Sequence, residues 1–171
     1  LWFCEGFNGR GSPIPAFSNG LLYVVNGKPG DTYAVKPGGS GDVTKSRMAW
    51  HAPRRGGRDL PSPAVVGGFL VVVSMSGLAT CYDTGSGKIH WQQNLGLKGE
   101  YAAAPLVADG HILIQSVYGG KTVVLKPGKR FDVLGINDLG AEVDEIFRAC
   151  LAPIQGRMYA RSLSMLYCIE R

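Results

Sequence analysis

A pattern of short apolar runs, separated by turns that contain glycine, recurs four times along the chain. Each unit opens with a proline before its first apolar run, and the openings are Ser12-Pro13-Ile14, Ser62-Pro63-Ala64, Ala104-Pro105-Leu106 and Ala152-Pro153-Ile154. A two-residue turn follows each first run, at Asn19-Gly20, Gly67-Gly68, Asp109-Gly110 and Gln155-Gly156. The opening prolines are 50, 42 and 48 residues apart. Periods of this length with several short strands in each unit predict the blades of a β-propeller.

The unit between residues 61 and 91 shows the predicted blade most clearly. Its apolar runs predict an innermost strand at 64–66, a second at 69–73, a third at 78–82 and the start of an outer strand at 89–91. Gly67-Gly68 suits a tight hairpin turn, because glycine adopts positive φ without steric cost. The fold class expected is therefore all-β, with about four consecutive four-stranded antiparallel blades that form part of a larger disc.

We expect residues 1–171 to form one partial propeller domain that starts inside a disc. Residues 1–10 are expected to supply the outer strand of a preceding blade. Blades then follow at 11–60, 61–100 and 101–147, with an incomplete last blade at 148–171 that lacks its outer strand. The third blade has no tryptophan and reaches about Ile136 in its place. The disc is expected to be an open arc, and the alternative is a four-bladed ring that Leu1-Trp2-Phe3 would close.

Composition adds a substantial core, no membrane-spanning run and one concentrated source of charge. Of the 171 residues, 45% are hydrophobic and 18% are charged, and no apolar run approaches the roughly 20 residues of a spanning helix. The formal net charge is +5, and the basic residues that are not balanced by acids stand close together. They are Lys45, Arg47, Arg54, Arg55 and Arg58. Because the rest of the chain is balanced, a nucleic-acid partner is not expected.

The segment Cys81-Tyr82-Asp83-Thr84-Gly85-Ser86-Gly87-Lys88-Ile89-His90-Trp91 resembles the tryptophan-docking repeat of quinoprotein propellers, written AxDxxTGKxxW. Cys81 replaces the alanine of that repeat and Ser86 replaces the threonine. With its Ser-Pro openings and hairpin glycines, the chain resembles the pyrroloquinoline-quinone-like (PQQ-like) β-propeller repeat family, closest in style to BamB-type and quinoprotein repeats. The resemblance implies a periplasmic or extracellular location. It also implies a set of residues that dock blades together, namely Trp2, Trp50, Trp91, Asp83 and Gly87.

No constellation in the sequence predicts a catalytic, cofactor-binding or metal-binding residue. The quinoprotein enzymes hold their quinone with a vicinal disulfide and a calcium site, whereas here no two cysteines are adjacent and no acid matches the calcium ligands. His51, His90 and His111 have no metal-ligand spacing and are interpreted as solvent-facing. Cys81 and Cys168 share one register of the third strand, which predicts small, buried, free thiols.

The best candidate for an interaction site is the basic stretch between Lys45 and Arg58. Within it, Arg54, Arg55 and Arg58 stand between an outer strand and the next inner strand, so a loop on one face of the disc is expected. The leading hypothesis is a non-catalytic propeller scaffold whose face loops bind a protein or an acidic polymer. Two alternatives stay open: a fragment of a PQQ-dependent oxidoreductase whose active site lies outside this segment, and a sensor or substrate-binding domain of a larger protein. A plain solvated loop is the alternative for the arginines.

Overall fold

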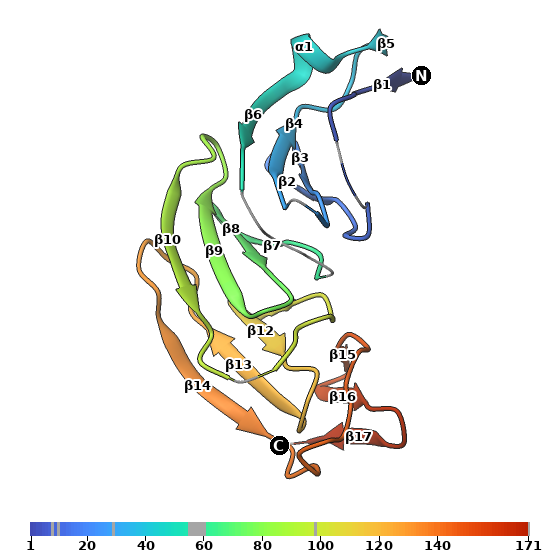
Figure 1. The fold of residues 1–171 in the computed structure, drawn as a ribbon, viewed down its shortest axis with the longest axis vertical. Helices are drawn as coiled ribbons and strands as arrows, with labels where there is room; N and C mark the ends of the chain where they lie inside the picture. Colours follow the sequence, from blue (N-terminus) through green and yellow to red (C-terminus); the bar gives the residue numbers. More distant parts are fainter. Residues whose placement is uncertain (8, 10, 29, 55–60, 98, 171) are drawn as a thin grey trace.

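The computed structural model describes residues 1–171 except 8, 10, 29, 55–60, 98 and 171. Within the described residues, four antiparallel sheets follow one another along the chain, and Figure 1 shows them side by side in an open arc. The first three sheets have four strands each and the last has three. The predicted all-β fold of consecutive antiparallel blades is therefore confirmed, and the last blade has three strands among the described residues.

Each blade runs from an innermost to an outermost strand in sequence order. The first blade consists of β2 (Ala16–Ser18), β3 (Leu21–Val25), β4 (Thr32–Val35) and β6 (Met48–Ala52). The second consists of β7 (Ala64–Val66), β8 (Phe69–Val73), β9 (Leu78–Asp83) and β10 (Ile89–Asn94). The third consists of β11 (Leu106–Ala108), β12 (His111–Gln115), β13 (Lys121–Leu125) and β14 (Val133–Asp138). The last consists of β15 (Ala152–Ile154), β16 (Arg157–Arg161) and β17 (Leu166–Ile169).

The turns between first and second strands have the backbone that tight hairpins require. Asn19 and Gly20 have φ of 51° and 75°, and Asp109 and Gly110 have φ of 46° and 73°. Positive φ at both central residues is the conformation that Asn-Gly and Asp-Gly favour, because these residues tolerate the left-handed region. The local sequence therefore sets the register of each hairpin.

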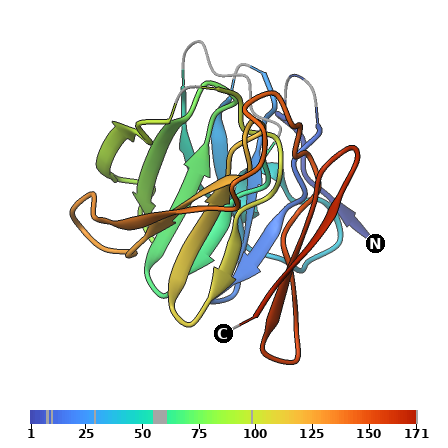
Figure 2. The ribbon, with the colours of Figure 1, turned by 90° about the horizontal axis from the view of Figure 1, so that it is seen from below.

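The core lies between the blades, which pack face against face (Figure 2). Successive side chains of a strand point to opposite faces, so a middle strand between two blades is apolar on both. In β8, Leu70 and Val72 belong to the core shared with the first blade, whereas Val71 and Val73 belong to the core shared with the third. A smaller core around Phe147 and its neighbours joins the third blade to the last.

The N-terminal segment packs against the first blade. Its short strand β1 (Trp2–Phe3) pairs in parallel with β5 (Gly41–Asp42), which lies in the connection between β4 and β6. That connection also holds the one-turn helix α1 (Thr44–Arg47). Trp2, Cys4 and Phe7 line an apolar surface together with residues of β3 and β4. In the described chain β17 pairs with β16 alone, so the ring-closing alternative is wrong and the arc is open.

Two local expectations, at Ile136 and at Cys168, are corrected by the structure. Gly135, not Ile136, stands opposite Val124 in the outer strand of the third blade, at the position that tryptophan holds in the first two blades. The connection that follows β14 has no helix among its residues 139–151; it makes a single bridge between Tyr118 and Ile146. Cys168 is exposed, because β17 turns it away from the third blade, whereas Cys81 is buried as expected.

Candidate functional site

The indole of Trp50 links the first blade to the second. Trp50 lies in β6, is 9% exposed, and stacks on Tyr82 of β9 with ring centroids 6.2 Å apart. Its Nε1 donates a hydrogen bond of 2.9 Å to the carbonyl oxygen of Thr84, in the turn between β9 and β10. One side chain therefore holds the turn of the next blade by both surface contact and a hydrogen bond.

The turn that Trp50 contacts is shaped by Asp83 and Gly87. The Asp83 Oδ1 accepts hydrogen bonds from the backbone N (2.9 Å) and the Oγ (2.7 Å) of Ser86. These bonds hold the pKa of Asp83 below its usual range, and the bond from the Ser86 hydroxyl has the largest effect. Gly87 has φ of +70°, and a Cβ there would lie 2.6 Å from Cε3 of Trp50. The turn thus needs glycine both for its backbone conformation and for the approach of the indole.

Trp91 makes the equivalent contact between the second and third blades, and Trp2 does not. The Nε1 of Trp91 donates a hydrogen bond of 3.0 Å to the carbonyl of Gly128, in the turn between β13 and β14. The Phe131 ring packs edge-on against Trp91 with centroids 5.1 Å apart. Trp2 is partly exposed in β1 and lies beside the first blade. The resemblance therefore grouped three tryptophans of which Trp50 and Trp91 lie between blades, whereas Trp2 lies beside the first blade.

The structure divides the basic stretch between two sides of the molecule. Lys45 and Arg47 lie in α1, before β6, and Arg54 follows the other end of β6. A five-residue strand separates them, so the stretch does not form one surface. Arg55 and Arg58 lie outside the described residues. Of the three arginines in the candidate interaction site, on the β6–β7 connection (residues 53–63), Arg54 is therefore the one whose position the structure gives.

A polar cluster that the sequence analysis missed anchors this connection. The backbone N of Arg54 donates to Asp31 Oδ1 (2.9 Å), and His51 Nε2 lies 2.8 Å from Asp31 Oδ2. The ring of Tyr33 is stacked on the His51 ring, with centroids 4.3 Å apart. Burial alone would raise the pKa of Asp31, but the hydrogen bonds from Arg54 and His51 outweigh it and lower that pKa. Only the pairing of β4 with β6 brings Asp31 and His51 together, so spacing in the sequence carried no signal of the cluster.

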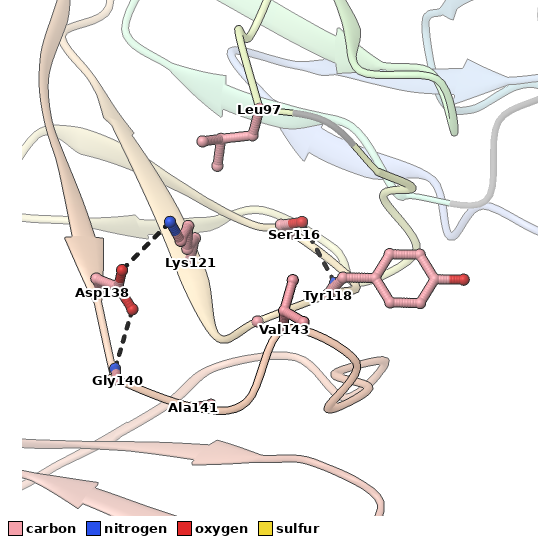
Figure 3. A pocket seen from close by; sticks show the side chains of 9 residues that line it. Leu97, Ser116, Tyr118, Lys121, Asp138, Gly140, Ala141 and Val143 are labelled. Atoms are coloured by element: carbon pink, nitrogen blue, oxygen red, sulfur yellow. Dashed lines mark hydrogen bonds and ion pairs between the residues drawn. The ribbon is translucent and has the colours of Figure 1, made fainter.

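A pocket of about 410 Å³ opens beside the third blade, at the turn between β12 and β13 (Figure 3). Lys121 Nζ lies 3.3 Å from Asp138 Oδ2, and Asp138 Oδ1 accepts a 2.9 Å hydrogen bond from Gly140 N. The Gly140 amide and Lys121 lower the pKa of Asp138. The Tyr118 ring points away from these groups in Figure 3. The two charged side chains of the lining are thus already paired with each other.

Two searches of the described residues gave negative findings. No group of three or more histidine, cysteine, aspartate or glutamate side chains is placed to hold a metal ion in the described part of the chain. Among the same residues, no helix has the length and apolarity to cross a membrane.

Consecutive antiparallel blades, with a tryptophan that bonds a turn carbonyl of the next blade in the first two, define a β-propeller of the quinoprotein type. The model of one propeller family, described as outer membrane protein assembly factor BamB, matches residues 33–130 of this chain. Since this match covers more than half of the chain, the chain belongs to that family. The predicted PQQ-like, BamB-type resemblance is confirmed.

Solved structures agree on the fold. BamB from Moraxella catarrhalis is 17% identical with a TM-score of 0.70, over 93% of this chain and 46% of BamB. The computationally designed Ika4 protein is 10% identical with a TM-score of 0.70, over 99% of this chain and 96% of Ika4. Quinohemoprotein alcohol dehydrogenase ADHIIG from Pseudomonas putida HK5 is 13% identical with a TM-score of 0.67, over 94% of this chain and 30% of the enzyme.

These matches cover nearly all of this chain but only part of BamB and of the dehydrogenase. The chain spans about half the length of the BamB structure and about a third of the dehydrogenase. At these identities the likeness describes the fold. No curated protein matches the chain in sequence.

Proposed function

We propose that the chain is part of a non-catalytic propeller scaffold that binds a protein partner outside the cytoplasm through the loops of its disc face. Membership of a family described as an outer membrane protein assembly factor supports a role in the cell envelope. The blade architecture supports a rigid frame, because turns are tied to neighbouring blades by Trp50 and Trp91. Loops on such a frame are the usual place for function.

The observation that carries the proposal is the anchoring of Arg54. Its backbone is bonded to Asp31, which also bonds His51, so the start of the β6–β7 connection is fixed at the edge of the first blade. This connection joins the first blade to the second, and it contains Arg54, Arg55 and Arg58. Arginine side chains suit bidentate contacts with carboxylates of an acidic protein partner. Charge of this kind speeds encounter more than it stabilises the fold.

The test is a triple substitution, Arg54→Ala, Arg55→Ala and Arg58→Ala. After in-cell crosslinking has identified the bound envelope protein, its capture by the purified chain is measured against salt concentration. The variant is expected to bind more weakly and with a flatter salt dependence. Its free energy of unfolding is expected to change by about 1 kcal/mol or less, because the hydrogen bond from the Arg54 backbone to Asp31 does not depend on the side chain.

A matched control removes the same charge elsewhere. The control variant combines Arg148→Ala, Arg157→Ala and Arg161→Ala. These residues lie on the last blade and on the connection before it, and the control variant is expected to retain capture. Equal loss in both variants would show that only net charge matters. Recovery of the chain solely in the cytoplasmic fraction of its native cell would contradict the envelope role.

A further inference from the structure

Three connections along the convex side of the arc carry more basic than acidic residues. They join the third strand to the outer strand of the first three blades, at residues 36–47, 84–88 and 126–132. Figure 1 shows them at the same ends of β6, β10 and β14, each reaching toward the preceding part of the arc. We call their basic residues the cationic rim. These residues are Lys36, Lys45, Arg47, Lys88, Lys126, Lys129 and Arg130.

The cationic rim is not neutralised by the protein itself. In the part of the chain that the structure describes, none of its seven cations lies within 4.0 Å of a carboxylate oxygen. Three cations elsewhere do have partners: Lys121 is paired with Asp138, Arg148 with Glu100 and Arg157 with Glu170. Lys28 and Arg161 have no such partner among the described residues, so the rim is distinguished by the number of unpaired cations that it gathers.

Two of the nearby carboxylates are used by the turns themselves. Asp42 Oδ1 accepts a hydrogen bond of 2.9 Å from Thr44 N, and Asp83 Oδ1 accepts two from Ser86. With Asp132, three acids stand in or beside the three connections against seven basic residues. The three connections therefore carry a local excess of positive charge. A field of one sign along an exposed edge attracts a partner of the opposite sign.

The blade contacts hold this row of charges in place. Lys88 follows Gly87, which lies against the Trp50 indole, and Lys129 follows Gly128, whose carbonyl is bonded by Trp91. The basic residues on successive connections are thus attached to backbone that is fixed to the preceding blade. Binding of a partner to a fixed row of side chains costs less conformational entropy than binding to a mobile loop.

From this geometry we propose that the cationic rim binds an extended acidic polypeptide segment. The surface lies at the opposite ends of the strands from Arg54, so the inference goes beyond the face-loop function proposed above. The rim follows the curve of the arc across three blades. A flexible chain can follow that curve, whereas a flat lipid surface touches a convex edge over a short length only. Exposed apolar side chains stand beside the rim, at Ile89 (49% exposed) and Leu134 (52% exposed). The segment that fits would therefore carry apolar residues among its acidic ones.

The experiment measures, by fluorescence anisotropy, the binding of a labelled 20-residue peptide. The peptide is made of acidic repeats that contain glutamate and leucine. The rim variant combines Lys88→Gln, Lys129→Gln and Arg130→Gln, which are all exposed. The matched control combines Lys28→Gln, Arg148→Gln and Arg161→Gln, which removes the same charge from the other ends of the strands. Each exposed ion pair contributes little by itself, so the loss of three is expected to weaken binding about tenfold. The control is expected to bind within about twofold of the unsubstituted chain.

Three further measurements decide between the proposal and its competitors. A six-residue peptide of the same composition is expected to bind more weakly, because it cannot reach from one blade to the next. Equal loss of binding in rim and control variants would overturn the proposal, since net charge alone would then explain it. Tighter binding to phosphatidylglycerol vesicles or to a sulfated polysaccharide than to the peptide would also overturn it. The Arg54, Arg55 and Arg58 variant is expected to keep peptide binding, which separates this surface from the face loop.

Discussion

At the scale of single residues, the tryptophans of the outer strands decide how blades are joined. Trp50 and Trp91 each bury most of a large ring between two blades and bond a turn carbonyl of the next blade. A buried indole N–H without a partner would be costly, so the hydrogen bond also fixes the position of the turn. Glycine at position 87 completes the contact, because the indole occupies the space that any side chain would need.

Gly87→Ala is expected to destabilise the chain by about 2–4 kcal/mol, because alanine would add the strain of a positive φ to a clash with Trp50. Gly85→Ala is the control in the same turn, since its φ is not in the left-handed region and the nearest atom to its Cβ would be 3.6 Å away. Urea unfolding of both variants measures the difference. Equal midpoints for the two would show that the indole does not constrain position 87.

The cysteines show how one sequence register leads to two environments. Cys81 is fully buried between the second and third blades, and burial raises the pKa of its thiol to about 12. Cys168 stands in the equivalent strand of the last blade and is exposed. The residue type and register are the same, so the difference comes from whether another blade covers that face of the sheet.

At the scale of elements, the ends of β4 and β6 hold the cluster that anchors the β6–β7 connection. Asp31 precedes β4, and His51 and Arg54 lie in and after β6. The antiparallel pairing places Tyr33 opposite His51, which brings the imidazole to the carboxylate. A single carboxylate thereby links two strands and the backbone of the connection.

This cluster predicts a dependence of stability on acid. The pKa of Asp31 is lower in the folded protein than in the unfolded chain, so its stabilising effect is complete above about pH 4 and is lost as the pH falls through the folded pKa. Asp31→Asn is expected to be less stable at pH 7 and to lose less stability between about pH 4 and pH 2. Denaturant unfolding across this range measures the effect. Asp144→Asn, at an exposed carboxyl, is the control, and an identical pH profile in Asp31→Asn and the unsubstituted chain would contradict the linkage.

At the scale of the whole molecule, the arc leaves sheet edges and faces uncovered. Among the described strands β17 has one neighbour, and Leu166 within it is 68% exposed. Unpaired edge strands with apolar side chains invite pairing with another chain. The isolated chain is therefore expected to associate through its last blade.

Leu166→Lys is expected to reduce this association, because an inserted charge on an edge strand opposes strand pairing. Light scattering at increasing protein concentration measures it. Ile14→Lys is the matched control, since Ile14 is 73% exposed and lies outside the strands. If both substitutions improved solubility equally, charge and not the edge would be responsible. A monodisperse, stable monomer of the unsubstituted chain would count against the association itself.

The sequence by itself determined the number and order of the blades, but not the short parallel pair of β1 and β5. Short apolar runs, turn glycines and opening prolines act over a few residues, so the four blades could be predicted without tertiary information. The docking motif from Asp83 to Trp91 pointed to the family for the same reason, since all its residues lie in one turn and its flanking strands. The order of the predicted strands also placed Arg54 between an outer strand and the next inner strand. This part of the candidate site therefore follows from the local sequence.

Only the tertiary structure decided which charges share a surface. Lys45 and Arg54 are close in the sequence, but β6 separates them, whereas Lys88 and Lys129 are distant in the sequence and lie on successive connections of the rim. The same holds for Asp31 and His51, which meet through strand pairing, and for Trp2, which packs beside the first blade. Neighbours across blades depend on how whole sheets stack, and residue spacing along one strand carries no information about the sheet that will face it.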